Sequence, residues 1–198
     1  MKKFEITKEQ SEYLATIFHN QNMLILGSAG TGKSVLALEA IKRQMEKDCE
    51  SKILYLCSNA PFKKQVNDIL DSDREFSREN ITVDTFLNYF GLSFYDSIKI
   101  KREKVIKYAK NLYSYSLIII DEAQELQSEL LYDIKVLANH SKFYIFGDEE
   151  QRIQNQHDDN QENEWKNNLE IVNPIRLIKN YRNPLNIVSL SKKLLPEA

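Results

Sequence analysis

One segment constrains the fold of this chain more than any other, the sequence LILGSAGTGKSVL at residues 24–36. An apolar run at 23–26 is typical of a buried strand, and a helical pattern follows through Glu46. Between them lies the pattern G-x-x-x-x-G-K-[ST], whose glycines let successive backbone N–H groups turn toward an anion. The segment therefore predicts a phosphate-binding loop. The alternative, a Gly-rich surface turn, needs neither the lysine spacing nor the flanking strand and helix.

Every residue of this loop is expected to contact a bound nucleotide. The set is Gly27, Ser28, Ala29, Gly30, Thr31, Gly32, Lys33 and Ser34. We expect Lys33 to reach the β- and γ-phosphates and the hydroxyl of Ser34 to coordinate Mg²⁺. The helix that begins near Lys33 adds the positive end of its dipole to the same site.

The size and composition favour a single globular domain. A chain of 198 residues is long enough for one α/β core and short for two. We expect a cytoplasmic protein with no membrane partner, because no apolar run reaches bilayer length and none follows the basic start MKK. Cys49 and Cys57 fit neither a disulfide framework nor a metal-binding spacing, so both are expected to be reduced bystanders.

The charge is unevenly distributed, although the formal net charge is only -2. The basic stretch at 98–110 contains Lys99, Lys101, Arg102, Lys104, Lys107 and Lys110, against one acidic residue, Glu103. Two interpretations stay open. The stretch is either the solvated face of a helix with Val105, Ala109 and Leu112 on its apolar side, or a surface that contacts nucleic-acid phosphates.

Several apolar runs alternate with helical patterns along the chain. The runs are ILYLC at 53–57, ITV at 81–83, LIII at 117–120, FYIF at 143–146 and IRLI at 175–178. Helices are expected from Thr7 and over 61–70, 98–110, 128–139 and 184–195, with a polar loop at 154–168. Runs that are apolar throughout are typical of parallel strands covered on both faces. We therefore expect a parallel α/β sheet with its ligand site beyond the carboxyl ends of the strands.

Acidic residues follow the LIII strand directly, as Asp121 and Glu122. At a strand tip beside the phosphate loop, Asp121 is expected to hold the Mg²⁺ shell and Glu122 to act as general base toward water. The alternative is a pair of acids that favours the dipole of the next helix. Gln151, just after the run at 143–146, is a candidate sensor of the γ-phosphate or its water.

The motifs together resemble the UvrD/Rep-like superfamily 1 helicases, from the Q motif through motif IV, over about residues 6 to 195. In order they are Gln10, GSAGTGKS, Cys57-Ser-Asn59, Val83-Asp-Thr-Phe86, IIIDEAQ, FGDEEQ and the segment Leu177 to Pro184. The resemblance implies an α/β P-loop NTPase of RecA-like, three-layer sandwich type. Residues 1–198 would be one ATP-binding domain, and 171–198 would begin a second motor domain that is missing.

The resemblance also implies roles for residues outside the loop. Gln10 would read the adenine edge, although a capping box with Thr7 explains it equally well. Tyr181 would stack on the adenine, Arg182 would act as an arginine finger, and Gln124 and Gln151 would couple nucleotide to DNA. The residues implied to line a single-strand track are Ser58, Asn59, Thr85 and Phe86, and Phe86 fits the core as readily.

The implied function is an ATP- and Mg²⁺-dependent motor domain that acts on single-stranded DNA, with RNA as the alternative, and is incomplete for unwinding alone. Three departures bear on this implied function: Val35 replaces an arginine common after the loop, Glu125 replaces a more usual aspartate, and motifs V and VI are missing.

The alternative function is an ATP-dependent switch or adaptor that recruits a partner such as a nuclease, or is completed by a partner in trans. A phosphate-loop kinase or GTPase is disfavoured, because no N-K-x-D guanine signature is apparent and the DEAQ and GDEEQ segments fit helicase-like ATPases better.

Overall fold

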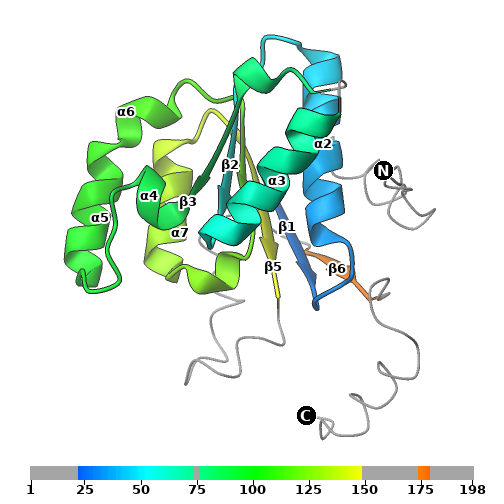
Figure 1. The fold of residues 1–198 in the computed structure, drawn as a ribbon. Helices are drawn as coiled ribbons and strands as arrows, with labels where there is room; N and C mark the ends of the chain where they lie inside the picture. The colour runs from blue at the N-terminus through cyan, green and yellow to red at the C-terminus, as the bar shows by residue number, and fades with distance from the viewer. Residues whose placement is uncertain (1–21, 74–75, 149–173, 179–198) are drawn as a thin grey trace, which may run out of the picture.

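Six parallel strands form the centre of the computed structural model, which describes residues 22–73, 76–148 and 174–178 (Figure 1). They are β1 (Asn22–Gly27), β2 (Ile53–Cys57), β3 (Ile81–Thr85), β4 (Leu117–Ile120), β5 (Lys142–Gly147) and β6 (Ile175–Leu177). The strand order is β3-β2-β4-β5-β1-β6, and every pairing is parallel. The predicted parallel sheet is therefore confirmed.

Helices cover both faces of this sheet (Figure 1). Residues of α2 (Lys33–Lys47) and α3 (Ala60–Ser72) pack in the core on one face. The core on the other face contains residues of α4 (Phe86–Tyr89), α5 (Ile98–Lys107), α6 (Ala109–Leu112) and α7 (Ser128–Leu137). Short 3₁₀ helices lie at Arg78–Asn80 and Ala123–Glu125. The result is the predicted three-layer α/β sandwich.

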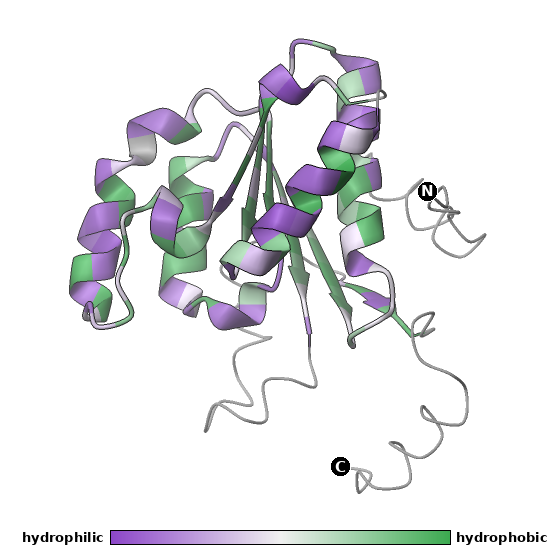
Figure 2. Ribbon diagram, in the orientation of Figure 1, coloured by the Kyte–Doolittle hydropathy of each residue, from purple (hydrophilic) through white to green (hydrophobic). Residues whose placement is uncertain are grey.

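The central strands are apolar throughout because each contributes side chains to both cores. On β4, Leu117 and Ile119 face the core with α2 and α3, whereas Ile118 and Ile120 face the opposite core. All residues of β2 and β4 are buried, and the strands at the centre of the sheet are predominantly hydrophobic (Figure 2). This explains why uninterrupted apolar runs, rather than alternating ones, predicted these strands.

Local signals set the ends of some elements and not of others. Asn59 caps α3 by accepting a hydrogen bond from the N–H of Phe62 (2.9 Å), and Pro61 occupies the first turn as predicted. The single helix predicted over 98–110 is instead two, because α5 ends at Lys107 and α6 begins at Ala109. The helices predicted from Thr7 and over 184–195, and the loop at 154–168, lie outside the described residues.

All carboxyl ends of the strands meet at one edge, because every neighbour is parallel. The β1–α2 connection, the residues after β4 and the end of β5 therefore lie together there. Within the described part of the chain, no helix combines the length and apolar character needed to cross a bilayer.

Candidate nucleotide and magnesium site

The β1–α2 loop has the backbone of a tight phosphate-binding turn. Gly30 and Gly32 have φ angles of 89° and 92°, which glycine adopts without strain, and α2 starts immediately after Gly32. A Cβ atom on Gly27 would lie 2.6 Å from Oγ1 of Thr31, so no other residue fits there without movement. The same Thr31 hydroxyl donates to the carbonyl of Ser28 at 2.8 Å and tightens the turn.

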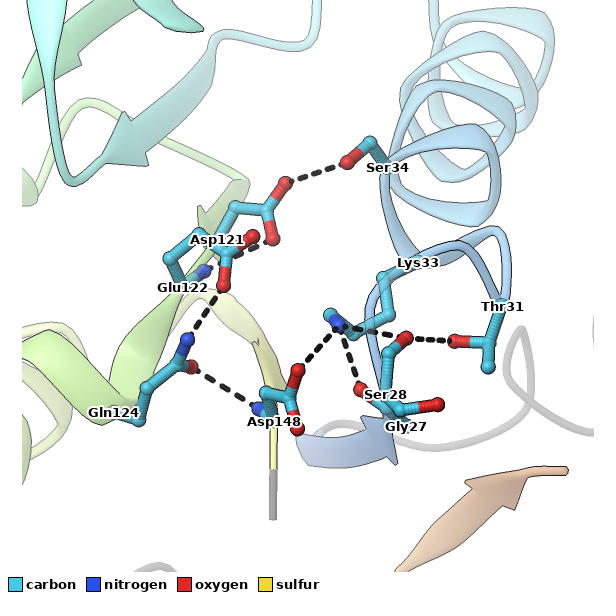
Figure 3. Close-up of polar contacts among 9 residues, drawn as sticks. All are labelled: Gly27, Ser28, Thr31, Lys33, Ser34, Asp121, Glu122, Gln124 and Asp148. Carbon is cyan, nitrogen blue, oxygen red and sulfur yellow. Dashed lines mark hydrogen bonds and ion pairs between the residues drawn. The ribbon is translucent and has the colours of Figure 1, made fainter. Parts of the chain in front are cut away.

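Lys33 extends over this turn, with its side chain buried (Figure 3). Its ammonium donates to the carbonyl oxygens of Gly27 at 2.6 Å and Ser28 at 3.3 Å. Asp148, after β5, lies on the other side, with 3.9 Å between Nζ and Oδ2. The positive charge is therefore held at the mouth of the loop by oxygen acceptors, which phosphate oxygens can replace.

Ser34 and Asp121 meet across the gap between α2 and β4 (Figure 3). The Ser34 hydroxyl donates to Oδ2 of Asp121 at 3.2 Å. The other carboxylate oxygen, Oδ1, accepts the backbone N–H of Glu122 at 2.9 Å. The two residues predicted to hold Mg²⁺ are thus in direct contact, although 87 positions separate them in sequence.

The environment of Asp121 fits a bound cation. Burial is the main cause that raises the pKa of this carboxyl group to about 6, and the charge of Glu122 adds to it, while hydrogen bonds from Tyr55, Glu122 and Ser34 oppose the rise. Among the described residues, no lysine or arginine forms an ion pair with Asp121. A divalent cation bound beside Asp121 would supply positive charge to this carboxylate.

Magnesium suits this donor set better than a transition metal. The described residues contain no cluster of three or more His, Cys, Asp or Glu side chains that could hold a metal by themselves. Mg²⁺ is usually bound by one or two carboxylates together with waters and substrate phosphates. Ser34 and Asp121, beside the phosphate loop, would form such a partial shell of oxygen ligands.

Glu122 and Asp148 are joined by the side-chain amide of Gln124 (Figure 3). The amide nitrogen donates to Oε2 of Glu122 at 2.6 Å, and the amide oxygen accepts the N–H of Asp148 at 3.0 Å. Glu122 has a φ angle of 56°, uncommon for a residue with a side chain. Backbone strain of this kind clusters at functional sites, and here it falls on the predicted general base.

Of the four residues predicted to line a single-strand track, three lie at strand ends and one is buried in the core. Ser58, Asn59 and Thr85 lie at the ends of β2 and β3, where Asn59 and Thr85 cap the helices that follow. Phe86 is only 3% exposed and packs in the core with α5 and α7, the alternative that the sequence left open. Its ring offers no surface for a base to stack on.

Four of the predicted site residues, Gln10, Gln151, Tyr181 and Arg182, lie outside the described residues, and their roles stay predictions. Two further residues at the site were missed. Asp148 follows the predicted strand at 143–146 after one glycine, a signal similar to the one that identified Asp121 directly after the strand at 117–120. Tyr55, which donates to Asp121, gives no such signal, because an aromatic residue within a strand is ordinary.

Comparison with known proteins assigns the chain to a family. A family model described as "AAA domain" matches residues 10–156, more than half of the chain, so the chain belongs to that family. No curated protein was found to match.

Solved structures with the same fold include three helicases. Pif1 helicase from Candida albicans has a TM-score of 0.66 at 20% identity, over 97% of this chain and 44% of that one. UvsW helicase from Bacteriophage T4 has a TM-score of 0.61 at 14% identity, over 90% and 61%. The helicase domain of Pyrococcus furiosus Hef has a TM-score of 0.57 at 17% identity, over 87% and 38%.

These likenesses show the fold, the helicase-type RecA-like P-loop domain. The resemblance to superfamily 1 helicases is confirmed at that level, and nothing singles out the UvrD/Rep-like branch. The chain spans less than two thirds of each of the three solved structures.

Replacing Lys33 tests the nucleotide site. Lys33→Ala removes the buried ammonium, so we expect the Kd for a fluorescent ATP analogue in Mg²⁺ to rise about tenfold to a hundredfold, the equivalent of about 1.5–3 kcal/mol for hydrogen bonds to a charged group. Fluorescence titration measures this. Lys47→Ala, at the exposed far end of the same helix, is the control and should leave the Kd unchanged. Equal affinities for the Lys33 variant and the wild type would contradict the assignment.

Proposed function

We propose that this chain is the ATP-binding motor domain of a helicase: it binds and hydrolyses ATP with Mg²⁺ and acts on single-stranded nucleic acid, DNA rather than RNA. The observation that carries the proposal is the 3.2 Å contact between Ser34 Oγ and Asp121 Oδ2, which unites the two expected Mg²⁺ ligands beside Lys33. The helicase names of the similar structures support it. Translocation by such motors needs two RecA-like domains, so we propose that unwinding requires a second domain, in this polypeptide or a partner.

In this proposal the chain prepares the phosphates for attack by water. Lys33 exchanges its carbonyl acceptors for β- and γ-phosphate oxygens and neutralises their charge. Mg²⁺ held by Ser34 and Asp121 would supply further charge stabilisation. Glu122, oriented by the 2.6 Å hydrogen bond from Gln124, accepts a proton from the attacking water. The γ-phosphoryl group passes to that water, and ADP leaves.

Part of the basic stretch supports a nucleic-acid partner. Arg102 and Lys104 serve the fold, because they pair with Asp133 and Asp96 at 2.7 Å. The remaining exposed lysines form no ion pair within the described residues; they are Lys99, Lys107 and Lys110. These lysines are available to phosphates, so the two interpretations of this stretch each describe part of it.

Two exposed aromatic side chains precede the basic helix. Phe94 and Tyr95 are 81% and 98% exposed, in the connection between α4 and α5. This connection reaches toward the same edge of the sheet as the β1–α2 loop (Figure 1). Lys99, in the first turn of α5, lies close to these rings in sequence. Exposed rings together with an unpaired lysine are the combination by which proteins bind single strands without reading sequence. We include them, with Ser58, Asn59 and Thr85, in the proposed contact surface and leave out the buried Phe86.

Steady-state hydrolysis tests the motor assignment. We expect single-stranded DNA to stimulate turnover by the wild-type chain. Glu122→Gln should lower turnover about 10²–10⁴-fold, the usual contribution of a general base, while ATP still binds. Glu125→Gln, an exposed acid three positions on, is the matched control and should retain turnover. Tight ATP binding with negligible wild-type turnover and no effect of DNA would instead favour the switch or adaptor.

Replacing the aromatic pair tests the nucleic-acid surface. The double substitution Phe94→Ala and Tyr95→Ala removes two stacking platforms, each worth about 1–3 kcal/mol per base, so the affinity for an oligonucleotide should fall tenfold or more. Fluorescence anisotropy with labelled single-stranded DNA and RNA measures the loss. Tyr113→Ala is the control, since Tyr113 is 63% exposed but lies between α6 and β4, at the opposite edge of the sheet. Equal loss in both variants would refute this surface.

A further inference from the structure

Tyr55 lies in the middle of β2 and reaches the tip of the neighbouring strand. It is paired with Ile119 of β4, and both side chains belong to the core on the α2 and α3 face. Asp121, two residues beyond Ile119, projects to the same face because side chains alternate along a strand. The Tyr55 hydroxyl donates to Oδ2 of Asp121 at 2.5 Å, and the whole tyrosine is buried.

This contact gives one carboxylate oxygen two hydroxyl donors. Oδ2 of Asp121 accepts Tyr55 from β2 and Ser34 from α2, while Oδ1 accepts the N–H of Glu122. An aspartate side chain can rotate about two bonds. The three donors approach the carboxylate of Asp121 from different directions, so together they hold it in one orientation. Ser34 alone, at 3.2 Å, is the longest of the three contacts and fixes that orientation least.

We propose that Tyr55 is a positioning residue for the magnesium site: its hydroxyl holds the Asp121 carboxylate in the orientation that faces Ser34. This inference rests on the proposed function. Tyr55 is fully buried behind Asp121, so it acts only through that carboxylate and touches neither nucleotide nor metal. Without the hydroxyl, the carboxylate must be ordered when the cation binds, and part of the binding free energy is lost to that ordering.

The test compares nucleotide binding with and without the metal. For the full chain, the Kd of a fluorescent ATP analogue is measured in saturating Mg²⁺ and in EDTA. The Kd in EDTA divided by the Kd in Mg²⁺ is the gain in affinity due to Mg²⁺. Tyr55→Phe removes one hydroxyl and keeps the ring, so we expect this gain to fall roughly three- to tenfold, as for one hydrogen bond, while the Kd in EDTA stays the same.

Tyr144→Phe is the matched control. Tyr144 is 1% exposed, lies on β5, pairs with the same Ile119 and belongs to the same core. Its loss of a buried hydroxyl should leave the Mg²⁺-dependent gain unchanged. An unchanged gain in Tyr55→Phe, or equal losses in both variants, overturns the inference. A wild-type chain with the same affinity in Mg²⁺ and EDTA overturns the proposed magnesium site itself, and the inference with it.

A second measurement does not depend on how Tyr55→Phe folds. With 3-fluorotyrosine incorporated at position 55 alone, ¹⁹F NMR reports the surroundings of this ring. We expect the resonance to shift when Mg²⁺ is added to the nucleotide-bound chain. The cation attracts the negative charge of the Asp121 carboxylate and so changes the hydrogen bond between that carboxylate and the tyrosine hydroxyl. The same label at position 144 should not shift. If the ¹⁹F chemical shift at position 55 does not change when Mg²⁺ is added, the inference is contradicted.

Discussion

A carboxylate buried without a cationic side chain is the interaction on which the site depends. Asp121 is fully buried, and the described residues give it only neutral donors, from β2, α2 and the backbone of the next residue. A buried charge is costly unless it is hydrogen-bonded and paired. Asp121 lies at the edge where β4 ends beside the β1–α2 loop, and there a metal ion bound with the nucleotide would supply the positive charge in our proposal.

The same edge joins the phosphate loop to the tips of two further strands. Lys33 lies between the loop carbonyls and Asp148 after β5, and Gln124 connects Asp148 to Glu122 after β4. When phosphates displace the contacts of Lys33, the environment of Asp148 changes, and Gln124 is in contact with that residue's backbone. These contacts connect the proposed phosphate site at Lys33 with Glu122, the proposed general base.

The sequence predicted the elements whose signals are local. The bounds of β2 and β4 were predicted correctly because both strands are apolar throughout, and the glycine spacing identified the loop. The division of the basic helix after Lys107 and the hydrogen bond from Tyr55 were not predicted, and the sequence left the burial of Phe86 as one of two alternatives. Each depends on packing or on strand register, which brings positions 55 and 121 together although nothing near either residue in sequence indicates it.

The most direct test of the central claim is a crystal structure of this chain with Mg²⁺ and a non-hydrolysable ATP analogue. The account predicts that the phosphates lie over the β1–α2 loop with Lys33 on the β- and γ-phosphate oxygens. It also predicts that the metal is bound by Ser34 Oγ, with Asp121 in its shell and still in contact with Tyr55. A nucleotide bound elsewhere, or one in the loop while Lys33 remains on the carbonyls of Gly27 and Ser28, would contradict the account.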